Sequence, residues 1–133
     1  DRLQTALPGI FMCGNSLHVH DLADFVTAES EEAGRHIAAC IGERRCLPRT
    51  TVPVSDGEAV RGVVPRQITV GTEGSVCLRY RPAGRVTRCR TAVYSGDTLI
   101  AQKRHLVVTP GEMCEITIDR ARVKGPVRVQ VER

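Results

Sequence analysis

The feature that most constrains the fold is a change of hydrophobic period near residue 59. From there to the last residue, short runs alternate apolar and polar side chains; in the run 127–131, Arg128 and Gln130 stand between valines. Period-two alternation is typical of strands that bury one face, and turns with glycine or proline separate the runs. We expect seven strands, at residues 59–64, 66–70, 74–81, 85–94, 98–108, 112–118 and 126–132.

So many short strands in one stretch predict an antiparallel β-sandwich of immunoglobulin-like size over residues 59–133, and hence a mainly β protein. The chain has no Trp, so the Cys…Trp…Cys signature of antibody domains is absent. The pattern therefore predicts a fold class and not a family. Residues 43–58, which contain Pro48, Pro53 and Gly57, have the composition of a linker.

Residues 1–42 follow a different pattern. Residues 7–13 are an apolar run after a Pro-Gly turn, which predicts a short buried strand. A helix is expected from between Asp21 and Thr27 to about Ile41, because apolar residues recur there at steps of three and four. Its other face carries Glu31 and Glu32 and is expected to be solvated. One strand and one helix cannot enclose a core, so this segment is expected to belong to a larger α/β sheet.

Composition argues against several classes of protein. No apolar run approaches the ~20 residues that a membrane-spanning helix requires. Aromatic residues make up only 3% of the chain, too few for a platform that stacks single-stranded nucleic acid. Residues 1–46 carry four arginines and seven acids, whereas the remainder is basic. Since the arginines of the basic part alternate with apolar residues, we expect a solvated sheet face there and no nucleic-acid partner.

The six cysteines form no C-x-x-C pair, and most lie within apolar or strand-like stretches. Small buried thiols in a reducing compartment explain this distribution, so we expect a cytoplasmic protein without structural disulfides. Cys40 and Cys46, near the end of the helix, are expected to be the most reactive thiols.

A resemblance to a known family rests on the stretch Thr5-Ala-Leu-Pro-Gly-Ile-Phe-Met-Cys-Gly-Asn15. It is similar to the segment near the end of the FAD domain in FAD-dependent pyridine nucleotide-disulfide oxidoreductases, T-x-x-P-G-[IV]-[FY]-A-x-G-D, which a helix rich in small residues follows. The segment Leu17-His-Val-His-Asp-Leu22 resembles a branch of predicted oxidoreductases in which the motif reads G-N and V-H-D follows. The resemblance covers about residues 1–42, and a β-sandwich after the flavin domain is similar to the tail of that branch.

This resemblance implies which residues lie near the cofactor FAD. Gly14, which has no Cβ, would let the backbone approach the cofactor. Asn15 stands where the family has an Asp that bonds a ribityl hydroxyl, and its uncharged amide can still form that bond. Val26 and Thr27 would lie at the start of the helix that faces the flavin pyrimidine, where free N–H groups favour negative charge.

The chain lacks the G-x-G-x-x-G fingerprint that holds a dinucleotide pyrophosphate. The resemblance therefore implies the C-terminal piece of a longer NAD(P)H-linked flavoenzyme, inactive and without bound FAD on its own. The first partner implied is the remainder of that enzyme. Because the helix has lost its sheet, a homodimer through residues 10–41 is also expected.

His18 and His20 alternate, so on an extended segment both rings share a face. They are two ligands where a zinc site needs three or four, so we expect no metal. The resemblance leaves either histidine able to donate a proton near the isoalloxazine in the intact enzyme. The alternative to a flavoenzyme piece is a stand-alone immunoglobulin-like binding module with a helical arm, and a basic nucleic-acid binder is the third possibility.

Overall fold

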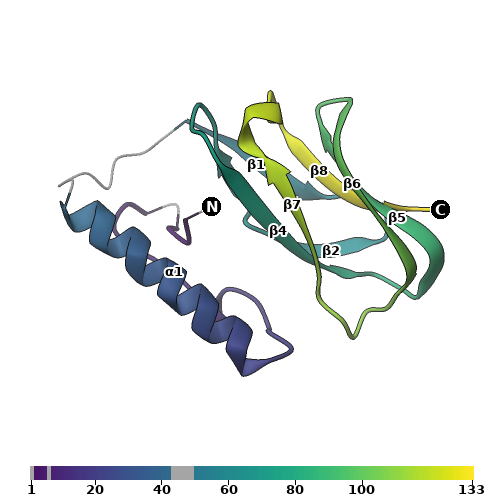
Figure 1. Ribbon diagram of the computed structural model, residues 1–133, viewed down its shortest axis with the longest axis horizontal. Coiled ribbons are helices and arrows are strands. Elements are labelled where there is room, and N and C mark those ends of the chain that lie inside the picture. The colour runs from purple at the N-terminus through teal and green to yellow at the C-terminus, as the bar shows by residue number, and fades with distance from the viewer. Residues whose placement is uncertain (1, 6, 43–49) are drawn as a thin grey trace. The chain divides into compact units, whose positions relative to one another are not determined.

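The computed structural model describes residues 2–5, 7–42 and 50–133 (Figure 1). The chain divides into two compact units, Asp1–Arg49 and Thr50–Arg133, called unit 1 and unit 2 below. The fold is mainly β, with one N-terminal helix followed by two sheets. No helix among the described residues is both long and apolar enough to cross a membrane.

Unit 1 consists of a looped N-terminal segment and one long helix, α1 (Ala23–Gly42). The segment contains a single turn of 3-10 helix, η1 (Gly14–Ser16). The predicted helix is confirmed, with Asp24 in its first turn, where a negative charge complements the helix dipole. Its start at Ala23 lies within the expected range and places Val26 and Thr27 at the fourth and fifth helical positions.

The strand predicted at residues 7–13 does not form. The segment makes only one isolated bridge, Gln4 to Phe11, next to hydrogen bonds from Thr5 N to Ile10 O and from Met12 N to Leu3 O, both 2.8 Å. The described part of unit 1 offers no neighbouring strand, and an apolar run without a partner cannot satisfy its backbone groups as a strand.

Unit 2 contains two sheets, which form two layers in Figure 1. One sheet has the strand order β3-β1-β8-β5-β6 and the other β2-β4-β7. The strands are β1 (Thr51–Asp56), β2 (Val60–Val64), β3 (Gln67–Thr69), β4 (Ser75–Pro82), β5 (Val86–Ser95), β6 (Thr98–Val108), β7 (Cys114–Asp119) and β8 (Val127–Glu132). A second turn of 3-10 helix, η2 (Arg120–Arg122), precedes β8. All seven predicted strands are present, with each bound within two residues of its expected position.

Two features differ from the expectation. Residues 51–56, expected as part of a linker, form β1, which pairs antiparallel with β3 and parallel with β8, so the larger sheet is mixed and not purely antiparallel. Pro53 suggested a linker, but Val54 on the same strand is 4% exposed and belongs to the core. Gly57 then lets β1 end close to β8, because a Cβ there would lie 2.8 Å from Val129 O.

The core of unit 2 lies between the two sheets. Buried and more exposed positions alternate along β4 and β8, as the period-two pattern predicted. Val127, Val129 and Val131 are almost fully buried, whereas Arg128 between them is exposed. Both sheets contribute to one cluster: Val54, Val63, Leu78, Val93, Ile116 and Val129.

The cysteines divide into two groups. Cys13, Cys77, Cys89 and Cys114 are free thiols, as expected. Burial raises the pKa of the Cys77 and Cys114 thiols, which disfavours the reactive thiolate. Cys40 forms a disulfide, so the expectation of a chain without disulfides is wrong at that position. Cys46 lies outside the described residues.

Candidate functional site

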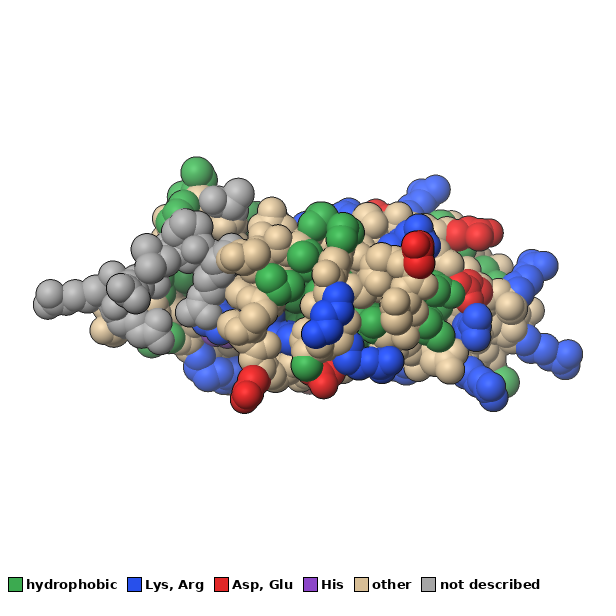
Figure 2. Space-filling view, turned by 90° about the horizontal axis from the view of Figure 1, so that it is seen from above, with side chains coloured by type: hydrophobic (Ala, Val, Ile, Leu, Met, Phe, Trp, Pro, Cys, Tyr) green, Lys and Arg blue, Asp and Glu red, His purple; other side chains and the backbone are tan. Residues whose placement is uncertain are grey.

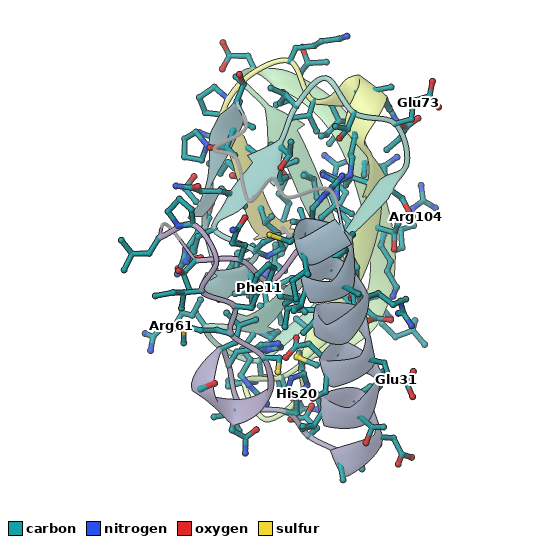
Figure 3. The ribbon with its side chains drawn as sticks, turned by 90° about the vertical axis from the view of Figure 1, so that its left-hand side faces the viewer. Phe11, His20, Glu31, Arg61, Glu73 and Arg104 are labelled. Carbon is teal, nitrogen blue, oxygen red and sulfur yellow. The ribbon has the colours of Figure 1, made fainter. Side chains whose placement is uncertain are left out.

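Three polar side chains of unit 1 converge at one point. His18 Nε2 lies 3.0 Å from Glu29 Oε1, and His20 Nε2 lies 3.0 Å from Glu29 Oε2. The two imidazole rings are 4.2 Å apart between centroids and tilted by 50°. Glu29 and His20 have side chains only 1% exposed. One buried carboxylate on α1 therefore holds both histidines of the preceding loop, and Figure 3 shows His20 beside α1, with Glu31 pointing away.

The loop is shaped by short-range hydrogen bonds around η1. Leu17 N donates to Gly14 O at 2.9 Å, and Ser16 Oγ donates to Cys13 O at 2.8 Å. Asn15 Oδ1 accepts from the backbone N–H of His20 at 3.3 Å, which closes the loop between them. These bonds turn the chain so that both rings of the His-x-His segment face Glu29.

Gly14 joins the loop to the helix. Its backbone N–H donates to Glu29 Oε2 at 2.7 Å, and its φ of +64° is one that residues with a Cβ rarely adopt. A Cβ at Gly14 would lie 3.3 Å from Val26 Cγ1. Glycine thus meets both a conformational and a steric requirement at this position.

Glu29 is ionised despite its burial. Burial alone would raise its pKa, but hydrogen bonds from His20, His18 and the Gly14 N–H together outweigh that effect and leave the pKa lowered. An ionised carboxylate only accepts hydrogen bonds, so each Nε2 must donate to it. The other ring nitrogen of His20, Nδ1, is buried and has no hydrogen-bond partner within the described part of the chain.

The structure brings together some of the residues that the sequence singled out and separates others. Gly14 lies against Val26, and His18 lies against His20. Asn15 and Thr27 are exposed, and the Thr27 hydroxyl donates to Ala23 O within the helix at 3.3 Å.

The sequence analysis did not identify Glu29. It lies three residues after Val26 and four before Ala33, so it shares the inward face of α1 with them. An acid among apolar residues on a helix stripe is the signal that could have revealed it. Glu31 was correctly placed on the solvated face: it is 68% exposed and lies 4.0 Å from Arg35.

With Glu29 included, the cluster holds three potential metal ligands where the sequence offered two. The three ligand atoms lie within 4.8 Å of one another. The same groups can also act as a hydrogen-bonded acid–base pair, in which a carboxylate orients an imidazole and stabilises its protonated form.

No protein-family model, curated protein or solved structure matches this chain.

Proposed function

We propose that the chain is the C-terminal part of an FAD-dependent NAD(P)H oxidoreductase. Unit 1 is the last piece of its FAD-binding domain, and unit 2 is an appended immunoglobulin-like sandwich with a structural or docking role. In that enzyme a hydride passes between nicotinamide and flavin, and the chain by itself is not catalytic. The proposal combines the sequence resemblance of residues 5–22 with one structural observation, the uncovered apolar surface of unit 1.

That surface is the main structural support. Of the 20 residues of α1, only Glu29 and Ala33 are buried. Among the described residues, most of the exposed large hydrophobic side chains lie in unit 1: Leu7, Ile10, Met12, Val19, Leu22, Phe25, Ile37 and Ile41. Scattered exposed apolar residues are ordinary, but such a concentration on one small unit indicates an interaction surface. A missing α/β sheet is the cover that this proposal supplies.

The residues proposed to contact FAD differ in accessibility. Asn15 is exposed, and its amide hydrogens can donate to a ribityl hydroxyl. Gly14 is buried and its N–H donates to Glu29 Oε2, so its support for the proposal is limited to its lack of a Cβ. Val26 lies in the first turn of α1, near the positive end of the helix dipole, where the Phe25 N–H already donates to Leu22 O at 3.2 Å. The N-terminal turn of α1 would thus face the flavin through Val26, while Thr27 lies just beyond it.

His20 is the better candidate of the two proposed proton donors. Glu29 fixes its ring through Nε2, and its Nδ1 lacks a partner among the described residues. A flavin held by the rest of the enzyme would give that atom a partner.

The test begins with this chain and continues with its parent. The 133-residue chain, checked by intact mass, is expected to be colourless and to bind no FAD. The open reading frame that contains it is expected to encode an upstream G-x-G-x-x-G, and its purified product is expected to show flavin absorbance that NAD(P)H bleaches. A full-length product without bound flavin, or a frame without the fingerprint, contradicts the proposal.

A second candidate is a stand-alone binding module, since unit 2 has a complete core of its own. A monomer in which the apolar face of α1 is protected from solvent would favour it. A nucleic-acid role has less support: on the face shown in Figure 2, Lys and Arg side chains are scattered among other residues and form no continuous patch. Salt-dependent retention on DNA or RNA is the observation that would favour that role.

A further inference from the structure

The His18–His20–Glu29 cluster has the geometry of a metal site. Two atoms that each lie ~2.1 Å from one ion can be at most ~4.2 Å apart. Around a tetrahedral ion two such ligands lie ~3.4 Å apart. The three ligand atoms of the cluster lie within 4.8 Å of one another, so the widest pair needs to close by at most about 1.4 Å to contact a single ion. Side-chain rotations of His18, which is 14% exposed, can supply that movement.

The donor set selects a class of metal. Imidazole nitrogens suit Zn²⁺, Fe²⁺, Ni²⁺ and Cu²⁺, whereas Mg²⁺ and Ca²⁺ prefer sites made only of oxygen. Two imidazoles and one carboxylate supply three ligands and leave at least one coordination position open.

The ligands are also held in place by neighbouring groups. Glu29 accepts the Gly14 N–H at 2.7 Å, and the backbone N–H of His20 is held by Asn15 at 3.3 Å. Such supporting hydrogen bonds orient ligands before an ion arrives, and their loss typically weakens metal binding 10- to 100-fold. The Gly14 N–H therefore supports the Glu29 carboxylate as in known metal centres, whereas Asn15 positions the backbone of His20 and not its ring.

We propose that His18 Nε2, His20 Nε2 and the Glu29 carboxylate bind a divalent transition-metal ion of the Zn²⁺ class. On binding, each Nε2 exchanges its hydrogen bond to Glu29 for a bond to the ion, and each neutral ring carries its hydrogen on Nδ1. The ion fastens the loop after η1 to α1. This inference does not depend on the flavin proposal, because all three ligands belong to unit 1.

The experiment is a titration of the purified, metal-stripped chain with ZnCl₂, followed by calorimetry and by ellipticity at 222 nm. Because α1 is the one α-helix of the described residues, that signal reports unit 1. We expect one Zn²⁺ per chain and a higher thermal midpoint of the helical signal. Co²⁺ is expected to give visible d–d bands without the near-ultraviolet band of a thiolate ligand.

The variants His18→Asn, His20→Asn and Glu29→Gln are each expected to weaken Zn²⁺ binding at least about 100-fold, since each removes a direct ligand. His36→Asn is the matched control: it removes a histidine of α1 that lies outside the cluster, and it is expected to bind Zn²⁺ as the wild type does.

A measurement on the wild type tests the proposal even if the variants fail to fold. Long-range ¹H–¹⁵N spectra are expected to show Zn²⁺-dependent shifts at the Nε2 atoms of His18 and His20, with His36 and His105 unchanged. The proposal is overturned by absent binding, by a thiolate band, by binding that survives in the three folded variants, or by unmoved His18 and His20 resonances. Any of these leaves a purely hydrogen-bonded cluster.

Discussion

The backbone N–H of Gly14 donates to Glu29 Oε2 at 2.7 Å, across fifteen residues of sequence. The resemblance implies that the bend at Gly14 lies near the flavin. This bond connects that bend to the inward face of α1. The same carboxylate holds both loop histidines. One buried acid thus holds the Gly14 N–H and the rings of His18 and His20 together.

Replacement of Glu29 is therefore expected to loosen the loop. Glu29→Gln replaces one carboxylate oxygen, which accepts a hydrogen bond from an imidazole, with an amide N–H₂, which can only donate. At least one imidazole N–H then has no acceptor, and an unsatisfied buried donor costs about 1–3 kcal/mol. We expect a loss of about 2 kcal/mol in the free energy of unfolding, measured by urea denaturation at 222 nm without added metal. Glu31→Gln, on the exposed face of α1, is the control and is expected to change it by less than about 0.5 kcal/mol. Equal effects of the two substitutions would refute the role assigned to Glu29.

Gly14→Ala and Gly34→Ala are expected to have opposite effects. At Gly14, the positive φ and the 3.3 Å contact with Val26 Cγ1 make a Cβ unfavourable by about 1–2 kcal/mol. Within α1, a Cβ at Gly34 meets no atom within 4 Å, and Ala stabilises a helix by about 0.5–1 kcal/mol over Gly. The same helical unfolding signal measures both changes. A Gly14→Ala variant as stable as the wild type would show that the bend tolerates a side chain.

The site was only partly predictable from the sequence. The bend at Gly14 and the pair His18 and His20 were evident from local patterns. Glu29 was not, because its role depends on a loop that turns back onto the helix, and that return is set by hydrogen bonds between residues 9 to 15 positions apart. Helical spacing alone places Glu29 inward but does not say which polar groups meet it.

The fold of unit 2 was more predictable, because its strands carry the period-two pattern in their own residues. The sequence did not predict β1, because this strand contains only two valines, which Pro53 separates, and Gly57 follows it. Its pairing with β8 joins residues more than 70 positions apart, and short-range sequence patterns contain no information about such pairing.

The isolated chain is expected to self-associate through residues 10–41. An apolar helix face without cover gains free energy by burial against a second copy, at about 25 cal/mol per Å². Light scattering after gel filtration is expected to show a mass that rises with concentration. Leu22→Lys with Ile41→Lys, at positions 59% and 72% exposed, should restore the monomer mass, whereas Leu106→Lys in unit 2, 87% exposed, should not. A strictly monomeric wild type at high concentration would contradict this expectation.

Low pH is expected to destabilise the fold of unit 2, because Asp56 becomes protonated. Burial would raise the pKa of Asp56, but hydrogen bonds from Val63 N–H, from Arg66 and from Gly62 N–H outweigh it and lower the pKa from its ordinary value of 3.8. Because the folded state has the lower pKa, the stabilisation is complete above about pH 4 and is lost as the pH falls through the folded-state pKa. Both tyrosines lie in unit 2, so tyrosine fluorescence follows its unfolding.

The matching variant is Asp56→Asn, which should reduce the loss of stability between about pH 4 and pH 2. Asp97→Asn, in the exposed turn between β5 and β6, is the control and should keep the wild-type profile. An unchanged profile in Asp56→Asn would assign the acid sensitivity to other carboxylates.

The buried hydroxyl of Tyr80 is expected to contribute to the stability of unit 2. Tyr80 is 1% exposed, and its hydroxyl bonds Thr91 Oγ1, which in turn lies 2.8 Å from His105 Nε2. Burial raises the pKa of Tyr80, so the hydroxyl stays neutral at all ordinary pH values. Tyr80→Phe removes the buried hydroxyl that bonds Thr91 and is expected to cost about 1–2 kcal/mol in urea unfolding, followed by the fluorescence of Tyr94.

Tyr94→Phe is its matched control, followed by the fluorescence of Tyr80. The Tyr94 hydroxyl bonds Glu132 Oε1 at 2.8 Å near the surface, where water can replace the lost partner, so a cost below about 1 kcal/mol is expected. Since β4 and β5 lie in different sheets, the Tyr80–Thr91 bond joins the two layers, whereas the Tyr94–Glu132 bond stays within one sheet. If Tyr94→Phe lowered the free energy of unfolding more than Tyr80→Phe does, the Tyr80–Thr91 bond would not be the more stabilising of the two.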